Sequence, residues 1–170
     1  MEETLRIAGV VKESIVDGPG IRYTVFTQGC PHKCFGCHNP QTHDFNGGKQ
    51  VKISSIVDDI SKNPLIKGVT ISGGDPFVQA PQVVKLIDQL NSKGNYNIIV
   101  YTGYTYEQLI KSSTYENGFE ELLSLTDILI DGKFDMEQKD NFIPFRGSSN
   151  QRAIDAKNSL EKGEIILHNF

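Results

Sequence analysis

The chain has 170 residues, a formal net charge of −4 and an isoelectric point near 5.5. A chain of this length can bury a substantial core, so we expect a single domain over residues 1–170. The acidic balance disfavours a nucleic-acid partner, because a phosphate backbone attracts positive charge. The longest apolar runs are far shorter than a membrane span, and we therefore expect no membrane association.

Four segments of the chain have the composition of short β-strands. Each is rich in β-branched and aromatic residues and is bounded by residues that favour turns. In chain order, the expected strands are residues 22–27, 68–72, 97–102 and 127–131. The C-terminal tail, about residues 141–170, has a weaker pattern, in which residues 164–167 are the expected final strand.

Helical patterns are expected between these strands. The clearest begins at Pro81, which suits a first helical turn, and repeats apolar residues at the spacing of one helical face. An earlier helix is expected to be capped by Ser54–Ser55 and to end near Asn63–Pro64. Two more are expected, one from about Tyr106 and one over residues 119–125.

The alternation of strands and helices predicts an α/β fold with a mostly parallel sheet. Four clear strands are too few to close an eight-stranded barrel, so the sheet is expected to be open. In such sheets the reactive site lies beyond the carboxyl ends of the strands. The segments that follow the four strands contain the cysteines, Gly73–Gly74–Asp75, Thr102–Gly103–Tyr104 and Asp131–Gly132–Lys133. We therefore expect these segments to share one rim of the sheet.

All three cysteines of the chain, Cys30, Cys34 and Cys37, lie within eight residues in a C-x3-C-x2-C pattern. The odd count argues against a disulfide framework and favours a reducing compartment, so a cytoplasmic location is expected. Three thiolates can hold a four-iron cubane and leave one iron open to another molecule. A zinc site that recruits His32 or His38 as a fourth ligand is the alternative.

The cysteine pattern resembles the signature of the radical S-adenosylmethionine superfamily. Over roughly residues 8–152, the chain resembles the members that activate glycyl-radical proteins. The blocks that carry this likeness are Asp17–Arg22, Gln28–Cys30, Ser72–Pro76, Tyr101–Tyr104, Asp131–Phe134 and Arg146–Arg152. The last block is similar to the branch that acts on anaerobic ribonucleoside-triphosphate reductase.

The resemblance implies an open partial (βα) barrel with a [4Fe-4S] cluster on Cys30, Cys34 and Cys37, in a loop over about residues 28–40. S-adenosylmethionine would bind the fourth iron, and an external one-electron donor such as flavodoxin or ferredoxin would drive its cleavage to a 5′-deoxyadenosyl radical. That radical would take a hydrogen from a glycine of the reductase. The implied cofactor-binding residues are Gly36, Cys37, His38, Gly73, Gly74, Asp75, Thr102 and Lys133.

Several of these positions also have ordinary structural interpretations. Gly73–Gly74 can form a tight strand exit, and Lys133 can pair with a neighbouring aspartate. The resemblance implies that the Gly73–Gly74–Asp75 motif holds the methionine ammonium of S-adenosylmethionine through backbone carbonyls and an acidic side chain. Asp75 stands where many members of the superfamily have glutamate, which reaches further, so the resemblance implies the backbone contact of Gly74 more directly than a contact of Asp75. Arg146 and Arg152 are expected to order the tail or to contact the partner, with a solvated turn as the alternative.

The remaining histidines and the choice of substrate leave further alternatives. His32 is expected to face solvent or a docking partner, and no role follows for His43 or His168. Two other functions would share the cluster and the fold. One is activation of a different glycyl-radical enzyme, and the other is small-molecule radical chemistry such as that of a deazapurine synthase. The Arg146–Arg152 block argues against the second.

Overall fold

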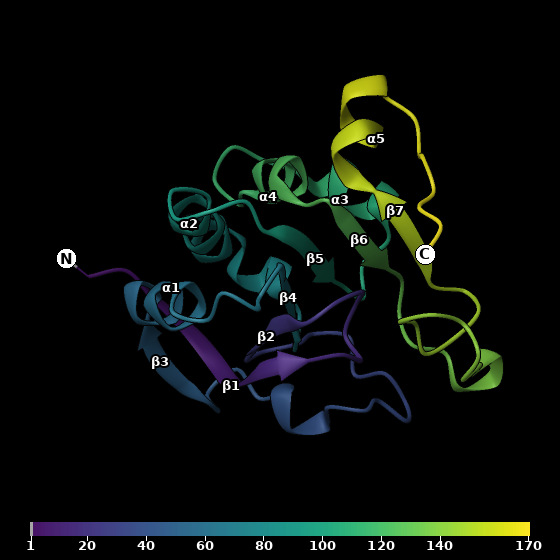
Figure 1. The fold of residues 1–170 in the computed structure, drawn as a ribbon. Helices are drawn as coiled ribbons and strands as arrows, with labels where there is room; N and C mark the ends of the chain where they lie inside the picture. The colour runs from purple at the N-terminus through teal and green to yellow at the C-terminus, as the bar shows by residue number, and fades with distance from the viewer. Residues whose placement is uncertain (1) are drawn as a thin grey trace.

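One seven-stranded sheet in the order β3-β1-β2-β4-β5-β6-β7 organises residues 2–170, the part of the chain that this computed structural model describes (Figure 1). The strands are β1 (Thr4–Ser14), β2 (Arg22–Thr27), β3 (Lys49–Lys52), β4 (Gly68–Gly73), β5 (Asn97–Tyr101), β6 (Ile128–Asp131) and β7 (Arg152–Asp155). The helices are α1 (Ile53–Ser61), α2 (Ala80–Asn91), α3 (Tyr106–Ser112), α4 (Phe119–Leu125) and α5 (Ala156–Lys162). Short 3-10 helices are η1 (Pro40–Thr42), η2 (Pro76–Gln79) and η3 (Met136–Gln138).

The centre of the sheet is parallel, which confirms the expected α/β fold with an open sheet. Strands β2, β4, β5 and β6 are neighbours and run in the same direction. Arg22 pairs with Gly68 and Gly68 with Asn97, so three strands begin at one level. Their carboxyl ends consequently share one edge. The outer pairs, which involve β1, β3 and β7, are antiparallel.

The four predicted strands agree with β2, β4, β5 and β6, whereas several boundaries elsewhere were wrong. Ser54–Ser55 do not cap α1, because this helix already begins at Ile53 and has no side-chain cap. The expected final strand over residues 164–167 is also wrong, since only Leu167 forms an isolated bridge, to Ile154. Strands β1, β3 and β7 and helix α5 were not predicted. Strands β3 and β7 form the two edges of the sheet, β1 lies between β3 and β2, and α5 follows β7.

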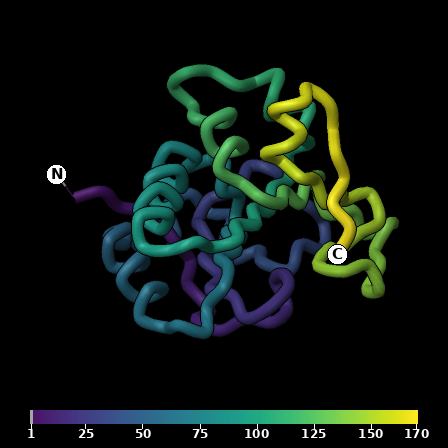
Figure 2. The backbone as a smooth tube through the Cα atoms, turned by 45° about the horizontal axis from the view of Figure 1, so that its top comes forward, coloured from purple at the N-terminus to yellow at the C-terminus, as the bar shows by residue number. Residues whose placement is uncertain are grey.

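Helices cover one face of the sheet and form the main core with it. Helices α1, α2 and α4 lie side by side on this face (Figures 1 and 2). Helix α2 buries the predicted apolar face, Val83, Val84, Leu86, Ile87 and Leu90. Burial of each such side chain stabilises the fold by roughly 1.5–3 kcal/mol. Among the helices of residues 2–170, none has the length and apolar character needed to cross a membrane.

The opposite face of the sheet carries a smaller cluster of Ile99, Ile128, Ile130 and Ala153. Successive residues of a strand point to opposite faces, so β5, β6 and β7 contribute to both cores. Beyond α5 the chain turns back and runs beside β7 (Figure 1). His168 N donates to the Ala153 carbonyl at 2.8 Å, so the C-terminal segment satisfies part of the outer edge of the sheet.

Arg22 is enclosed at the amino-terminal end of the parallel strands, where it is 2% exposed. Its guanidinium donates hydrogen bonds to Thr70 Oγ1 and to the Asn97 carbonyl, both at 2.8 Å. Burial lowers the pKa of Arg22 to about 10. The Asp17–Arg22 block therefore ties strands together at the edge of the sheet opposite the cysteines.

Candidate functional site

The cysteine loop leaves β2 and closes on its own start. Gly29 N donates to the Thr42 carbonyl at 2.7 Å, and Cys30 N donates to the His43 carbonyl at 3.2 Å. The side-chain amide of Gln28, a residue only 3% exposed, donates to two further carbonyls of the returning segment. These bonds hold the two ends of the loop together, so the three cysteines lie on one closed loop.

The three thiols are free, with Cys30 buried and Cys34 and Cys37 half-buried. Burial raises the pKa of Cys30 to about 11 and also raises the pKa of Cys34. Nucleophilic and disulfide-exchanging thiols have lowered pKa values instead. Within residues 2–170, no three Cys, His, Asp or Glu side chains already converge as a metal cage. Three free thiols on one closed loop nevertheless match the donor set of a cluster, whose binding displaces the thiol protons.

The two histidines considered as zinc ligands are engaged elsewhere. The expected solvent-facing position of His32 is wrong, because its side chain is only 6% exposed and its Nε2 lies 2.5 Å from Asp75 Oδ2. His38 is exposed, and its ring centroid lies 5.1 Å from that of Phe134. In this structure the His32 imidazole contacts Asp75 and the His38 imidazole contacts Phe134.

Asp75 is fully buried at the end of β4, and its carboxylate accepts hydrogen bonds from the surrounding segments. Besides the bond from His32, it accepts from Thr102 Oγ1 at 2.8 Å and Gly103 N at 3.0 Å. The N–H of Phe77, at the start of η2, donates to the other carboxylate oxygen at 3.0 Å. One carboxylate thus connects the cysteine loop, the end of β4 and the loop after β5.

Gly73–Gly74 forms the contact between β4 and the cysteine loop. Gly74 N donates to the Thr27 carbonyl, and Asp75 N donates to the Gly29 carbonyl, both at 2.8 Å. A Cβ atom at Gly74 would collide with the Gly29 carbonyl, one residue before Cys30. Glycine is required here because two backbone segments approach each other more closely than any side chain permits.

We expect Gly74→Ala to lower the free energy of unfolding by about 1–3 kcal/mol, the usual cost of forcing an extra methyl group into a closely packed site. It should also lower the iron content after anaerobic reconstitution, because the Gly29–Cys30 backbone must shift. Denaturant unfolding and iron analysis would measure both effects. Gly9→Ala is the matched control, since nothing lies within 4 Å of a Cβ atom at Gly9. A Gly74→Ala protein that is stable and fully loaded with iron would show that the loop tolerates a side chain.

The loop after β6 packs against the cysteine loop. Gly36 has φ +75°, and a Cβ atom there would collide with the Met136 side chain. Lys133 is exposed and forms no ion pair within residues 2–170, so the alternative pairing with a neighbouring aspartate is not observed. Together with Gly103 and Gly132, it lines a cavity of about 530 Å³ between the loops after β5 and β6. The ammonium group of Lys133 remains available to a carboxylate ligand.

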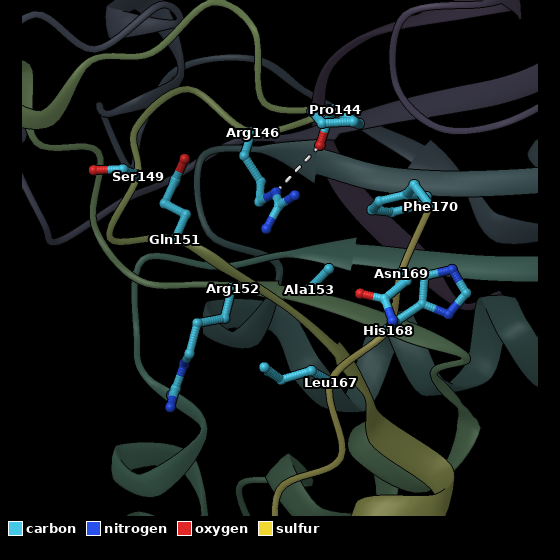
Figure 3. A pocket seen from close by; sticks show the side chains of 10 residues that line it. All are labelled: Pro144, Arg146, Ser149, Gln151, Arg152, Ala153, Leu167, His168, Asn169 and Phe170. Carbon is cyan, nitrogen blue, oxygen red and sulfur yellow. Dashed lines mark hydrogen bonds between the residues drawn. The ribbon is translucent and has the colours of Figure 1, made fainter.

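The two arginines of the last block lie in different environments. Arg152 donates to Asp131 Oδ1 at 3.0 Å and to Glu107 Oε1 at 2.6 Å, and these bonds raise its pKa. They tie β7 to β6 and α3. Arg146 lines a cavity of about 390 Å³ beside the C-terminal residues, whereas the guanidinium of Arg152 points away from it (Figure 3). Arg146 Nε donates to the Pro144 carbonyl at 3.2 Å, and no carboxylate within residues 2–170 pairs with Arg146.

His43 is a residue of the site that sequence reasoning missed. Its Nε2 lies 3.3 Å from the sulfur of Cys37, and the backbone N–H of Asn39 donates to the same sulfur at 3.4 Å. The sequence offers only a weak signal for this contact, a histidine six residues after a cysteine. The folding of η1 back toward Cys30 brings the imidazole to the thiol.

Comparisons with known proteins show the family of this chain. The family described as "4Fe-4S single cluster domain" matches residues 16–154. The anaerobic ribonucleoside-triphosphate reductase-activating protein of Escherichia coli (strain K12) is 34% identical over 144 residues, which cover 81% of this chain and 90% of that protein. Its counterpart in Vibrio cholerae serotype O1 is 37% identical over 145 residues, or 81% of this chain and 89% of that protein.

Two more distant similarities were found. The pyruvate formate-lyase-activating enzyme of Staphylococcus epidermidis is 33% identical over 132 residues, which cover 74% of this chain and 50% of that protein. The crystal structure of QueE from Escherichia coli has a TM-score of 0.48 and 18% sequence identity, and the match covers 60% of this chain and 54% of that chain.

The family match includes all three cysteines and the carboxylate that supports their loop. Cys30, Cys34, Cys37 and Asp75 all lie between residues 16 and 154. This match favours an iron–sulfur cluster over the zinc alternative. The chain belongs to the 4Fe-4S single cluster domain family and, within it, to the anaerobic ribonucleoside-triphosphate reductase-activating proteins.

Proposed function

We propose that this chain activates anaerobic ribonucleoside-triphosphate reductase by generating a glycyl radical on it. The observation that carries the proposal is the placement of three free thiols on one closed loop at the carboxyl edge of parallel strands. The names of the similar proteins from Escherichia coli and Vibrio cholerae support the same activity.

Cys30, Cys34 and Cys37 would hold a [4Fe-4S] cluster, with S-adenosylmethionine bound between the loops that follow β4, β5 and β6. When bound, these groups supply one-electron cleavage of a sulfonium and hence a radical that can abstract hydrogen. The protein positions them. Asp75 holds the loops together, and the Lys133 ammonium offers a partner for the carboxylate of the cofactor.

The reaction also needs an electron donor and a substrate glycine, and both are supplied by other proteins. An external one-electron donor, such as flavodoxin or ferredoxin, would reduce the cluster. The target glycine has no side chain to block the approach of the radical, and it must lie on a mobile segment that enters the site and leaves again. An open sheet suits a protein substrate, because a closed barrel would exclude a polypeptide loop. Free thiols suit a reducing compartment, and we place the protein in the cytoplasm.

Anaerobic reconstitution tests this proposal directly. The protein should bind about four irons per chain, as one cubane requires. With reductant, S-adenosylmethionine and the reductase, electron paramagnetic resonance should show a glycyl radical on the reductase. Pyruvate formate-lyase is the second substrate to test, because one relative carries the name of its activator. A radical on the lyase and none on the reductase would contradict the proposal, as would turnover of a deazapurine precursor.

A substitution of Arg146 can test whether this residue serves cofactor cleavage or recognition of the reductase. Its guanidinium lines the cavity beside the C-terminus and has no carboxylate partner within residues 2–170. We propose that it docks the reductase. Arg146→Ala should keep its iron and its cleavage of S-adenosylmethionine by chemical reductant, yet lose about tenfold or more in radical formation, which corresponds to roughly 1.4 kcal/mol of docking free energy.

Two control variants sharpen this test. Arg146→Lys should rescue poorly, because an ammonium lacks the planar fork of donors of a guanidinium. Lys111→Ala removes an exposed cation at the end of α3 and should leave radical formation unchanged. An equal loss of cofactor cleavage and radical formation in Arg146→Ala would assign the arginine to the cofactor site instead.

A further inference from the structure

We infer that His43 donates a hydrogen bond to the sulfur of Cys37 and thereby raises the reduction potential of the cluster. This inference rests on the proposed function, because it concerns the cluster that Cys37 would hold. The contact is direct, since His43 Nε2 lies 3.3 Å from Cys37 Sγ. The Asn39 N–H approaches the same sulfur at 3.4 Å, so two N–H groups surround one ligand atom.

The backbone fixes the position of this imidazole. His43 N donates to the Pro40 carbonyl at 3.2 Å, and the His43 carbonyl accepts from Cys30 N at 3.2 Å. The preceding residue, Thr42, is 1% exposed, and its hydroxyl donates to the Asn39 carbonyl at 2.6 Å. His43 is therefore held by main-chain bonds on both sides, and its half-buried ring is directed at the thiol by the closure of the loop.

The chemistry of the ligand determines the direction of the bond. A thiolate bound to iron has no proton and can only accept, so Nε2 must carry the hydrogen in the assembled site. Hydrogen bonds to cluster sulfurs are among the determinants of reduction potential. Reduction adds negative charge to the cluster, and a donor at the sulfur stabilises the more negative state preferentially. Removal of the donor should therefore make the cluster harder to reduce.

The test compares midpoint potentials of anaerobically reconstituted variants. His43→Phe keeps an aromatic ring but removes the donor, and its potential should shift to more negative values. His43→Gln keeps an N–H donor and should restore most of the shift. His168→Phe is the matched control, because it makes the same chemical change in the C-terminal segment, where it should leave the potential unchanged. Iron content and absorbance spectra would show that each variant carries the same cluster.

Each outcome supports or overturns the inference. If His43→Phe disturbs the loop so much that the protein no longer retains iron, His43→Met is the second variant. Its unbranched, flexible side chain also lacks an N–H donor and fits the loop with less disturbance. An unchanged potential in a fully loaded His43→Phe or His43→Met protein would overturn the inference. Equal shifts in the Phe and Gln variants would also overturn it, since packing alone would then be responsible. A wild-type protein without iron would instead contradict the proposed function itself.

Discussion

Replacement of any one of Cys30, Cys34 or Cys37 by alanine is expected to abolish cleavage of S-adenosylmethionine. With two thiolates, two irons of a cubane lack protein ligands, and the chain has no other cysteine to replace the lost one. Reconstitution should leave each variant with little of the roughly four irons per chain that one cubane needs. Iron analysis and measurement of 5′-deoxyadenosine by chromatography would quantify the two losses.

The same loop provides the control for this experiment. Phe35 lies between two of the cysteines, and it is 83% exposed, so Phe35→Ala removes a side chain that contributes little to packing. This variant should load iron like the wild type. Zinc in place of iron after strictly anaerobic isolation, or cleavage that survives loss of a cysteine, would contradict the assignment of the cluster.

Asp75→Ala is expected to be the most damaging substitution outside the cysteines. It removes the acceptor for His32, Thr102, Gly103 and Phe77, whose donors are then left without a partner in a buried site. Loss of one member of a buried charged network typically costs about 3–5 kcal/mol. The cysteine loop also loses its side-chain link to Asp75 through His32, although the backbone bonds of Gly74 and Asp75 remain, so iron loading should fall together with stability.

Denaturant unfolding measures the first effect and iron analysis the second. Asp88→Ala, which removes an exposed carboxylate from α2, should change the free energy of unfolding by no more than about 0.5 kcal/mol. Asp75→Asn should be intermediate, because the amide keeps one acceptor oxygen but turns an NH₂ group toward the other donors. A stable, iron-loaded Asp75→Ala protein that fails only to bind S-adenosylmethionine would show that Asp75 serves the cofactor instead of the loops.

The local sequence pattern was sufficient to predict the strands and the main helix at the centre of this fold. Residues 22–27 match β2, and the apolar spacing after Pro81 identified the buried face of α2. Both signals are contained within a dozen residues and are enforced by burial of one face. The short antiparallel strands β3 and β7 gave no comparable signal, whereas β1 was not predicted although Leu5 and Ile7 alternate with polar residues there. Strand β7, for example, has Ile154 as its one β-branched residue, and its partners are β6 and the C-terminal segment.

The amino-acid sequence by itself determined the donor set of the site, because three cysteines within eight residues must share a loop whatever the rest of the chain does. It also placed four segments on one rim, since parallel strands bring their carboxyl ends together. Only the tertiary structure showed how those segments support one another. Asp75 meets His32 across 43 residues and Thr102 across 27, and no local pattern specifies such pairs.

The contact between His43 and Cys37 and the different environments of Arg146 and Arg152 depend on tertiary structure in the same way. His43 follows Cys37 by six positions in the chain, but only the return of the chain toward Cys30 brings the imidazole to the sulfur. Arg152 finds its carboxylates on β6 and α3, whereas Arg146 meets none. Residue identity therefore specified the chemistry, and the packing of distant segments decided which groups remain available, because hydrogen-bond partners are assigned only when the chain has folded.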